Sequence, residues 1–296
     1  MSAKASKLRP PPFLPSGTIL DQYIVERALA NGGFSLVYLA RQLRDQTQVA
    51  IKEYLPKRLA HRTRLNHVVP ADKKRINPFQ RGRRLFIEEA KVLSRIKHHN
   101  IVQVLNYFTA NSTSYLVMSF DYGKTLSQHL KQHKKPVDED FIIRIFPVLL
   151  GGVQSIHENN LLHLDIKPEN ILIRGGDDPL LLDFGAAQPF PVVDGRKFGR
   201  VLTRGYSPCE QYKVDGNVGP WSDIYAIAAT IRMCIEGKAV PPAVDREKSD
   251  TLRPAVVAFK RQYSSFLLRA IDAGLELKPE NRPQSISEFL SLMHGP

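Results

Sequence analysis

The sequence predicts an α+β fold of two lobes, a small β-rich lobe over about residues 19–120 and a larger helical lobe over about 121–295. Segments of strand-like composition gather before residue 120, and segments with helical spacing follow Gly123. The charge divides at the same place: residues 1–120 hold 20 Lys and Arg against 7 Asp and Glu, whereas residues 121–296 hold 22 against 22. A chain of 296 residues is long enough for such lobes to bury a sizeable core.

The composition excludes several classes of protein. With 43% apolar and 24% charged residues, the chain is globular and not disordered. Its two cysteines, Cys209 and Cys234, cannot form a disulfide framework or a cysteine-rich metal site. No stretch approaches the ~20 apolar residues needed to cross a bilayer, and the N-terminus lacks the apolar run of a signal peptide. We therefore expect a cytoplasmic protein with no transmembrane segment in this chain.

The first elements are a tail and a hairpin. Residues 1–18 are rich in proline, which predicts a flexible, extended tail. Tyr23–Ala30 and Phe34–Ala40 have the composition of strands, and Asn31-Gly32-Gly33 separates them. Because Asn-Gly accepts positive φ angles, a tight hairpin turn is expected there.

The remainder of the small lobe is predicted to contain three strands and one helix. Gln48–Lys52 alternates as a strand does, and Arg84–Lys97 has apolar residues at helical spacing. Ile101–Phe108 and Ser114–Phe120 have strand-like composition.

Between these elements lies a basic insertion, residues 54–85, with ten basic side chains against Asp72. Prolines, among them Pro78, interrupt it. So much positive charge in one segment favours encounter with an acidic partner or an anionic surface. The alternative is that the segment is a solubilising, partly disordered insertion. The insertion has few aromatic side chains for base stacking, so a nucleic acid is not expected to be the main partner.

The second half is predicted to be helical. Phe141–Asn159 is apolar enough for a buried helix, although Pro147 and the pair Gly151-Gly152 are expected to bend or break it. Three further helices are expected, at Asp223–Glu236, Tyr263–Ala273 and Ile286–Met293.

The strongest chemical signal is the run from His163 to Asn170, followed after thirteen residues by Asp183-Phe184-Gly185. Apolar residues flank these polar groups, as a rigid catalytic loop requires. Phosphoryl transfer needs a carboxylate that orients the hydroxyl, hard oxygen ligands for a metal, and a nearby cation. Asp165 offers the carboxylate, Asn170 and Asp183 the ligands, and Lys167 the cation.

Together with Val49-Ala50-Ile51-Lys52 and Glu89, these motifs make the chain similar to a eukaryotic-type (Hanks-type) Ser/Thr protein kinase domain of the bacterial kind, from about Tyr23 to Met293. The resemblance implies a kinase domain over 19–295, with ATP in the cleft between two lobes. It implies transfer of the γ-phosphate of ATP to protein Ser or Thr, including autophosphorylation. Asp165, Lys167 and Asn170 would be catalytic.

The resemblance also implies an ATP site. Lys52, paired with Glu89, would hold the α- and β-phosphates, and Asn170 with Asp183 would hold Mg²⁺, with Mn²⁺ as an alternative. Adenine would lie among five apolar residues: Leu29, Val37, Ala50, Met118 and Leu172. The family's glycine-rich loop falls on Ala30, Gly32, Ser35 and Val37, so only the middle glycine is kept.

Leu164 is a second departure from the family's pattern. Many kinases have an arginine at this position, which binds a phosphate on the activation segment. Residues 185–202 contain no Ser, Thr or Tyr, so activity is expected not to depend on phosphorylation there. Further matches to the kinase family's pattern imply three contacts. Thr203 would lie near Asp165, Glu210 would pair with Arg282, and Asp223 would brace the catalytic loop.

Three alternatives stay open. The altered glycine loop motivates a pseudokinase that serves as a scaffold or binding module. A small-molecule phosphotransferase would share the Asp165–Asn170 spacing, but not Lys167 or the segment Thr203–Glu210. The basic insertion could carry the main role, although an accessory function suits it better.

Overall fold

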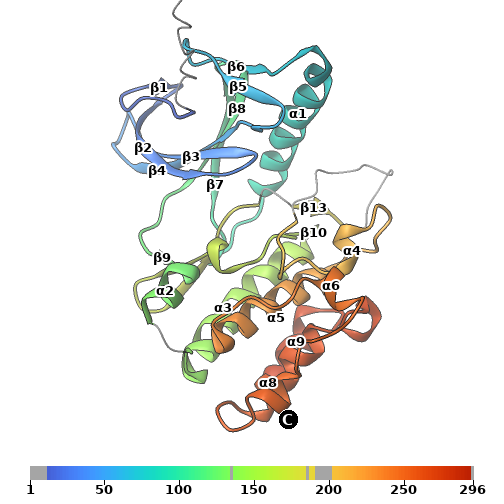
Figure 1. Cartoon of the computed structure of the whole chain (residues 1–296). Coiled ribbons are helices and arrows are strands. Elements are labelled where there is room, and N and C mark those ends of the chain that lie inside the picture. The colour runs from blue at the N-terminus through green and yellow to red at the C-terminus, as the bar shows by residue number, and fades with distance from the viewer. Residues whose placement is uncertain (1–11, 134–135, 185–186, 191–201, 295–296) are drawn as a thin grey trace, which may run out of the picture. The chain divides into compact units, whose positions relative to one another are not determined.

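The computed structural model describes residues 12–133, 136–184, 187–190 and 202–294. The chain forms two compact units (Figure 1). The first comprises the chain up to Arg95 together with Gln103–Phe120, and the second comprises Ile96–Val102 and the chain from Asp121. One boundary between the units thus falls after Phe120. Ile96–Val102 joins the second unit because its backbone bonds to Leu181 there, with Val102 N donating to Leu181 O at 3.0 Å.

The first unit is built on a six-stranded antiparallel sheet of order β1-β2-β3-β4-β8-β7. Side chains alternate along the strands, so that Leu36 and Tyr38 of β3 and Val117 of β8 enter one apolar core. The predicted strands are confirmed to within a few residues, and the two-residue strand β1 was not predicted. The bounds are β1 Ile19–Leu20, β2 Tyr23–Asn31, β3 Ser35–Gln42, β4 Gln48–Tyr54, β7 Val104–Ala110 and β8 Thr113–Ser119.

The turn between β2 and β3 differs from the prediction. None of Asn31, Gly32 and Gly33 has a positive φ, so the expectation of a tight Asn-Gly turn is wrong. The connection is instead a wider loop, Gly32 to Phe34, in which Gly32 N donates to Ser35 O at 3.0 Å. A longer loop closes without the left-handed backbone that a two-residue turn requires.

The basic insertion is ordered secondary structure. It forms the hairpin β5 (Ala60–Arg62) and β6 (Val68–Pro70), the short helix η1 (Lys73–Arg75) and the first half of α1 (Ile76–Leu93). Helix α1 starts eight residues before the predicted Arg84. Pro78 does not prevent this, because it lies in the first turn, where its missing N–H has no intrahelical partner.

Arg62 of this insertion is buried within the first unit. Its guanidinium pairs with Glu53, which is fully buried. The Tyr115 hydroxyl donates to the same carboxylate at 2.7 Å, and burial beside Glu53 raises the pKa of Tyr115, which keeps it protonated. Arg62 therefore cannot belong to a surface that meets an acidic partner.

The same guanidinium fixes part of the predicted tail. Arg62 Nε donates to Pro12 O at 2.9 Å, and Leu14 is only 5% exposed in the apolar core. Within the predicted tail, Phe13 and Leu14 thus bury apolar surface after the run of prolines. Residues 1–11 lie outside the described part of the chain.

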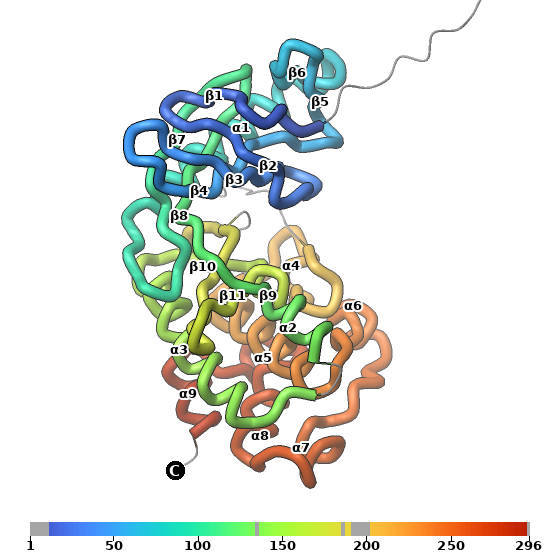
Figure 2. Tube along the Cα trace, turned by 90° about the vertical axis from the view of Figure 1, so that its left-hand side faces the viewer, coloured from blue at the N-terminus to red at the C-terminus, as the bar shows by residue number. Residues whose placement is uncertain are grey.

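The second unit is mainly helical (Figure 2). Helices α3, α5, α8 and α9 pack on one another, and a small sheet of order β12-β11-β9 packs on α3. The helices are α2 Leu126–His133, α3 Glu139–Glu158, η2 Pro168–Asn170, α4 Cys209–Tyr212, α5 Pro220–Glu236, α6 Ala243–Arg246, α7 Ala255–Ala258, α8 Ser265–Gly274, η3 Pro279–Asn281 and α9 Ile286–His294. The strands are β9 Lys124–Thr125, β10 Leu161–Leu162, β11 Ile171–Arg174, β12 Asp178–Leu181 and β13 Gln188–Pro189.

Helix α3 runs unbroken through Pro147 and the glycine pair, so the expected break does not occur. An internal proline costs ~3 kcal/mol, whereas each large apolar side chain that α3 buries gains about 1.5–3 kcal/mol, and α3 buries several. Gly152 allows close packing, because a Cβ there would lie 3.3 Å from Ile101. By length and composition α3 could cross a membrane, contrary to our expectation from the sequence, but its buried side chains make it a core helix of this unit.

Candidate active site

Three polar side chains predicted to be catalytic meet on the loop between β10 and β11 in the second unit. Lys167 Nζ contacts both carboxylate oxygens of Asp165, at 2.8 and 2.7 Å. Asn170 donates from Nδ2 to the Asp165 backbone oxygen at 2.8 Å and to Oδ2 at 3.0 Å. The hydroxyl of Thr203 donates to Asp165 Oδ1 at 2.7 Å, which confirms the placement expected for it.

Asp223 braces this loop from the first turn of α5, as predicted. Its buried carboxylate accepts hydrogen bonds from His163 N at 2.9 Å and from Leu164 N at 2.7 Å. His157 Nε2 approaches the same carboxylate at 2.8 Å. Burial alone raises the pKa of Asp223, but the contacts with His157 and His163 outweigh it and hold the pKa below its usual value. The Asp223 side chain is therefore a carboxylate anion that accepts hydrogen bonds from backbone N–H groups.

The His163 ring links the loop to the strand that precedes Asp183. Its Nδ1 accepts from Asp165 N at 3.3 Å, and Nε2 lies 3.2 Å from Leu182 O. Since a carbonyl oxygen only accepts, Nε2 carries the proton and the ring is neutral. Complete burial lowers the pKa of His163.

This buried neutral histidine should make stability depend on pH. Its pKa in the folded state lies below the ordinary 6.5, so the unfolded chain binds the extra proton. The contribution of this group to the free energy of unfolding is fully present above pH 6.5. It falls as the pH drops below 6.5, by up to about 1.4 kcal/mol per pH unit. We expect His163→Gln to remove this part of the slope in urea unfolding between pH 7.5 and 5.5. The exposed His61→Gln should keep the slope, and an unchanged slope in His163→Gln would contradict the assignment.

Leu164, at the position of the missing arginine, is buried in an apolar cluster with Leu162, Phe190 and Val218. Its φ is 60°, in the left-handed region that costs a non-glycine residue about 1–2 kcal/mol. Gln211 holds it, because Nε2 donates to Leu164 O at 2.9 Å. The Leu164 side chain thus makes its apolar contacts within this cluster. Most of the activation segment, residues 185–186 and 191–201, lies outside the described residues.

Two side chains offer oxygen ligands to a metal. The amide nitrogen of Asn170 is committed to Asp165, which leaves Oδ1 as its ligand atom. Asp183 is half-buried and follows β12 with a φ of 52°. Its neighbour Phe184 packs 5.0 Å from the His163 ring, centroid to centroid. Gly185 lies outside the described residues.

The first unit gathers most of the predicted ATP-site residues on the strands β2, β3, β4 and β8. Ala30 is opposite Val37, and Val37 is opposite Lys52. Ala50 lies two residues before Lys52 on the same face of β4, with Met118 opposite it on β8. Leu29 and Gly32 occupy the more exposed end of β2 and the loop after it.

Lys52 lies beside α1, the helix that carries Glu89. The Lys52 side chain is buried, and its Nζ lies 6.0 Å from the centre of the Phe86 ring on α1. Glu89 follows Phe86 by three residues, so both lie on one face of the helix. Leu172 belongs to the second unit, where β11 places it between Thr125 and Leu180. Whether the five apolar residues form one adenine pocket therefore stays a prediction.

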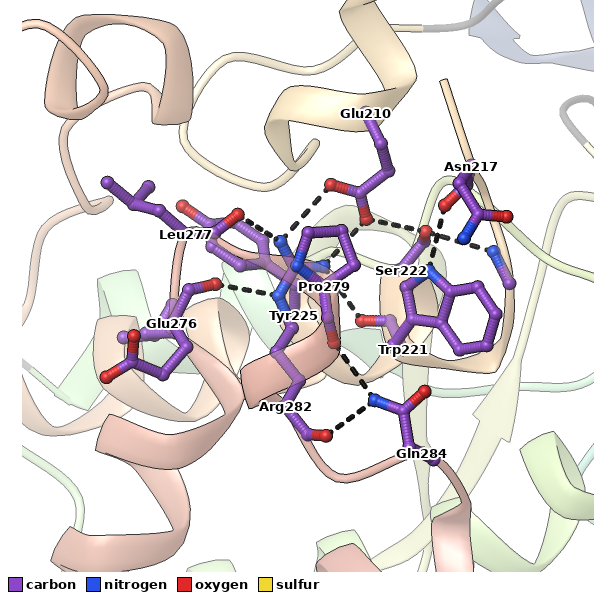
Figure 3. Close-up of polar contacts among 12 residues, drawn as sticks. Glu210, Asn217, Trp221, Ser222, Tyr225, Glu276, Leu277, Pro279, Arg282 and Gln284 are labelled. Atoms are coloured by element: carbon purple, nitrogen blue, oxygen red, sulfur yellow. Dashed lines mark hydrogen bonds and ion pairs between the residues drawn. The ribbon is translucent and has the colours of Figure 1, made fainter. Parts of the chain in front are cut away.

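Glu210 and Arg282 form the predicted buried pair (Figure 3). The guanidinium donates to the two carboxylate oxygens at 2.7 and 3.2 Å. It also donates to the backbone oxygens of Glu276, at 2.7 Å, and Leu277, at 2.9 Å. Ser222 Oγ donates to Glu210 Oε1 at 2.7 Å, so the carboxylate is held from both sides.

The sequence analysis did not identify two residues that support the loop. His157 contacts Asp223, and Gln211 donates to the backbone oxygen of Leu164. Neither residue lies in a recognisable motif. His157 is the basic residue in the last turn of α3, a position at which a histidine is usually explained by the helix dipole.

Comparisons with known proteins agree with this geometry. The sequence pattern of the family described as "Protein kinase domain" matches residues 23–293. Serine/threonine-protein kinase D of Synechocystis sp. is 27% identical over 288 residues, which cover 94% of this chain and 52% of that protein. Serine/threonine-protein kinase PknL of Mycobacterium tuberculosis is 28% identical over 225 residues, or 76% of this chain and 51% of that protein. The chain thus spans about half the length of these curated relatives.

A solved structure described as PpkA-294 in its apo form is 34% identical, covers 96% of this chain and 100% of that chain, and has a TM-score of 0.85. The fold and the family match together define a protein kinase domain. The chain belongs to the protein kinase domain family, among relatives that include bacterial Ser/Thr kinases.

Proposed function

We propose that this domain is an ATP- and Mg²⁺-dependent Ser/Thr protein kinase. The observation that carries the proposal is the cluster of Asp165, Lys167, Asn170 and Thr203 on a loop braced by Asp223. A carboxylate with a cation at 2.7 Å and a hydroxyl at 2.7 Å is equipped to orient an incoming alcohol.

In this proposal the Ser or Thr oxygen of the substrate attacks the γ-phosphorus of ATP, and the bond to the bridging oxygen of ADP breaks. Asp165 orients the hydroxyl and accepts its proton. Lys167 neutralises charge on the transferring phosphoryl group, and Thr203 fixes the rotamer of Asp165. Positioning and charge neutralisation account for most of the rate in such reactions.

The donor set fits a hard divalent cation. Asn170 Oδ1 and the Asp183 carboxylate are oxygen ligands, the type that Mg²⁺ prefers, and Mn²⁺ accepts the same ligands. The cation would neutralise charge on the nucleotide phosphates when bound. The positive φ of Asp183 turns the chain sharply just after β12.

In the first unit, Lys52 is proposed to hold the α- and β-phosphates, fixed by Glu89. Ala30 and Gly32 would let the backbone approach the phosphates, and Leu29, Val37, Ala50 and Met118 would contact adenine together with Leu172. The cross-strand row from Ala30 through Val37 to Lys52 supports this assignment.

The domain is also proposed to act without phosphorylation of its activation segment and to phosphorylate itself. Leu164 supports the first point, because its burial among apolar side chains leaves no cationic receptor at that position. Since the reaction uses ATP, the cytoplasm is the proposed location. The pseudokinase is the main alternative, because the glycine loop keeps one glycine of three.

Transfer from γ-labelled ATP tests this proposal. Phosphatase-treated protein is incubated with Mg²⁺, Mn²⁺ or EDTA and with peptides that carry a single Ser, Thr or Tyr. We expect metal-dependent labelling of Ser and Thr peptides from the start of the reaction. A lag that ends only when residues 186–202 become modified would overturn the claim of independence, and labelling of small alcohols alone would favour a small-molecule phosphotransferase.

A further inference from the structure

A second polar site lies within the first unit, between α1 and the hairpin β7–β8, elements that pack together. A hollow of about 560 Å³ that is open to solvent lies between these elements. The helix contributes Asn77, Gln80, Arg81 and Arg84, which are spaced three or four residues apart and therefore share one face. The hairpin contributes Ser114 from β8.

The hollow is strongly positive. Arg81, Arg83 and Arg84 all line it. Arg83 is fixed to the hairpin, since its guanidinium donates to Ser112 O at 3.2 Å. Arg81 and Arg84 are exposed, and among the described residues no carboxylate lies within ion-pair distance of either guanidinium. Like charges one turn apart repel each other, and a bound anion would relieve this repulsion.

Ser114 supplies an independent sign of a ligand. The residue is fully buried, and its hydroxyl has no hydrogen-bond partner among the described residues. Its neighbours Tyr115 and Val117 enter the core, so Ser114 lies on the opposite side of β8. A buried hydroxyl without a hydrogen-bond partner destabilises the fold, and an acceptor in the hollow would remove that cost.

We propose that this hollow binds the phosphate of a phosphorylated Ser or Thr in a polypeptide. A phosphate monoester carries nearly two negative charges and three acceptor oxygens, which matches several guanidinium groups and one hydroxyl better than a single carboxylate does. A concave site admits a side chain, whereas a flat basic face would suit a membrane. The choice of a phosphoprotein as the ligand rests on the proposed kinase function. The inference that the hollow binds an anion does not depend on that function.

The test is calorimetric titration of phosphatase-treated protein without ATP, so that the result is independent of kinase activity. The probes are a nine-residue Gly/Ser peptide with one central phosphothreonine, its unphosphorylated form, inorganic phosphate, and vesicles with anionic lipid. We expect Arg81→Ala to weaken phosphopeptide binding about tenfold or more, as loss of a charge-assisted hydrogen bond does. The charge-matched control Arg64→Ala, on the exposed turn of the β5–β6 hairpin, should bind as the wild type does.

Ser114→Ala separates binding from folding. Because the hydroxyl makes no hydrogen bond within the described residues, its removal should leave the unfolding midpoint unchanged or raised while it weakens phosphopeptide binding several-fold. Equal binding of the unphosphorylated peptide, or no binding of either peptide, overturns the proposal. Inorganic phosphate that binds as tightly as the phosphopeptide overturns the choice of a polypeptide, and binding to vesicles alone makes the site a membrane contact.

Discussion

Asp165→Asn should lower kcat by about 10²–10⁴-fold, the usual contribution of a general base or of its orienting effect. The substitution keeps the size of the side chain and its ability to accept from Thr203. It removes the negative charge that holds Lys167 and that receives the substrate proton. We expect KM for ATP to change far less than kcat, measured by initial rates at saturating peptide.

Asp177→Asn is the matched control for this prediction. Asp177 lies in the turn between β11 and β12, has a φ of 56° that asparagine tolerates, and makes a surface ion pair with Arg144. Surface substitutions of this kind change stability by about 0.5 kcal/mol or less, so its rate should equal that of the wild type. If Asp165→Asn stayed within threefold of the wild-type rate, Asp165 would not be the base.

Arg282→Met should destabilise the second unit by about 3–5 kcal/mol, because it leaves the Glu210 carboxylate buried without its cation. The backbone oxygens of Trp221, Glu276 and Leu277 would lose a donor as well. The guanidinium also lies 4.9 Å from the centre of the Tyr225 ring, a contact that is lost with it (Figure 3). Urea unfolding followed by circular dichroism measures the effect.

Two further variants make the test specific. Arg261→Met removes an exposed arginine of the same unit and should cost no more than about 0.5 kcal/mol. The double variant Glu210→Gln with Arg282→Met should cost less than the sum of the two single substitutions. Each single substitution leaves one buried charge unpaired, whereas the double variant leaves none. Additive costs would show that the pair is not coupled.

The catalytic loop could be predicted from the sequence because its residues lie within eight positions and interact locally. Asp165, Lys167 and Asn170 contact one another in the structure as the motif implied. The pairs Glu210–Arg282 and Thr203–Asp165 are long-range, and only the resemblance to the kinase family supplied them. His157 carried no such signal, because its role depends on how α3 meets α5.

The basic insertion was harder to predict for a physical reason. A run of basic residues is compatible with a solvated loop or with ordered structure, and composition does not distinguish them. Arg62 is buried because Glu53, nine residues earlier and on another strand, lies within reach. The start of α1 was placed too late because Pro78 was read as an interruption, although proline is well tolerated in a first turn.

The most direct test of the kinase assignment is phosphate transfer from labelled ATP with Mg²⁺, to the protein itself and to a generic basic protein, with the modified sites mapped by mass spectrometry. Lys52→Met and Asp165→Asn are assayed beside the wild type, and nucleotide binding is measured for all three. We expect transfer to Ser or Thr that both substitutions abolish. Nucleotide binding by the wild type without any transfer would contradict the assignment and identify the domain as a pseudokinase.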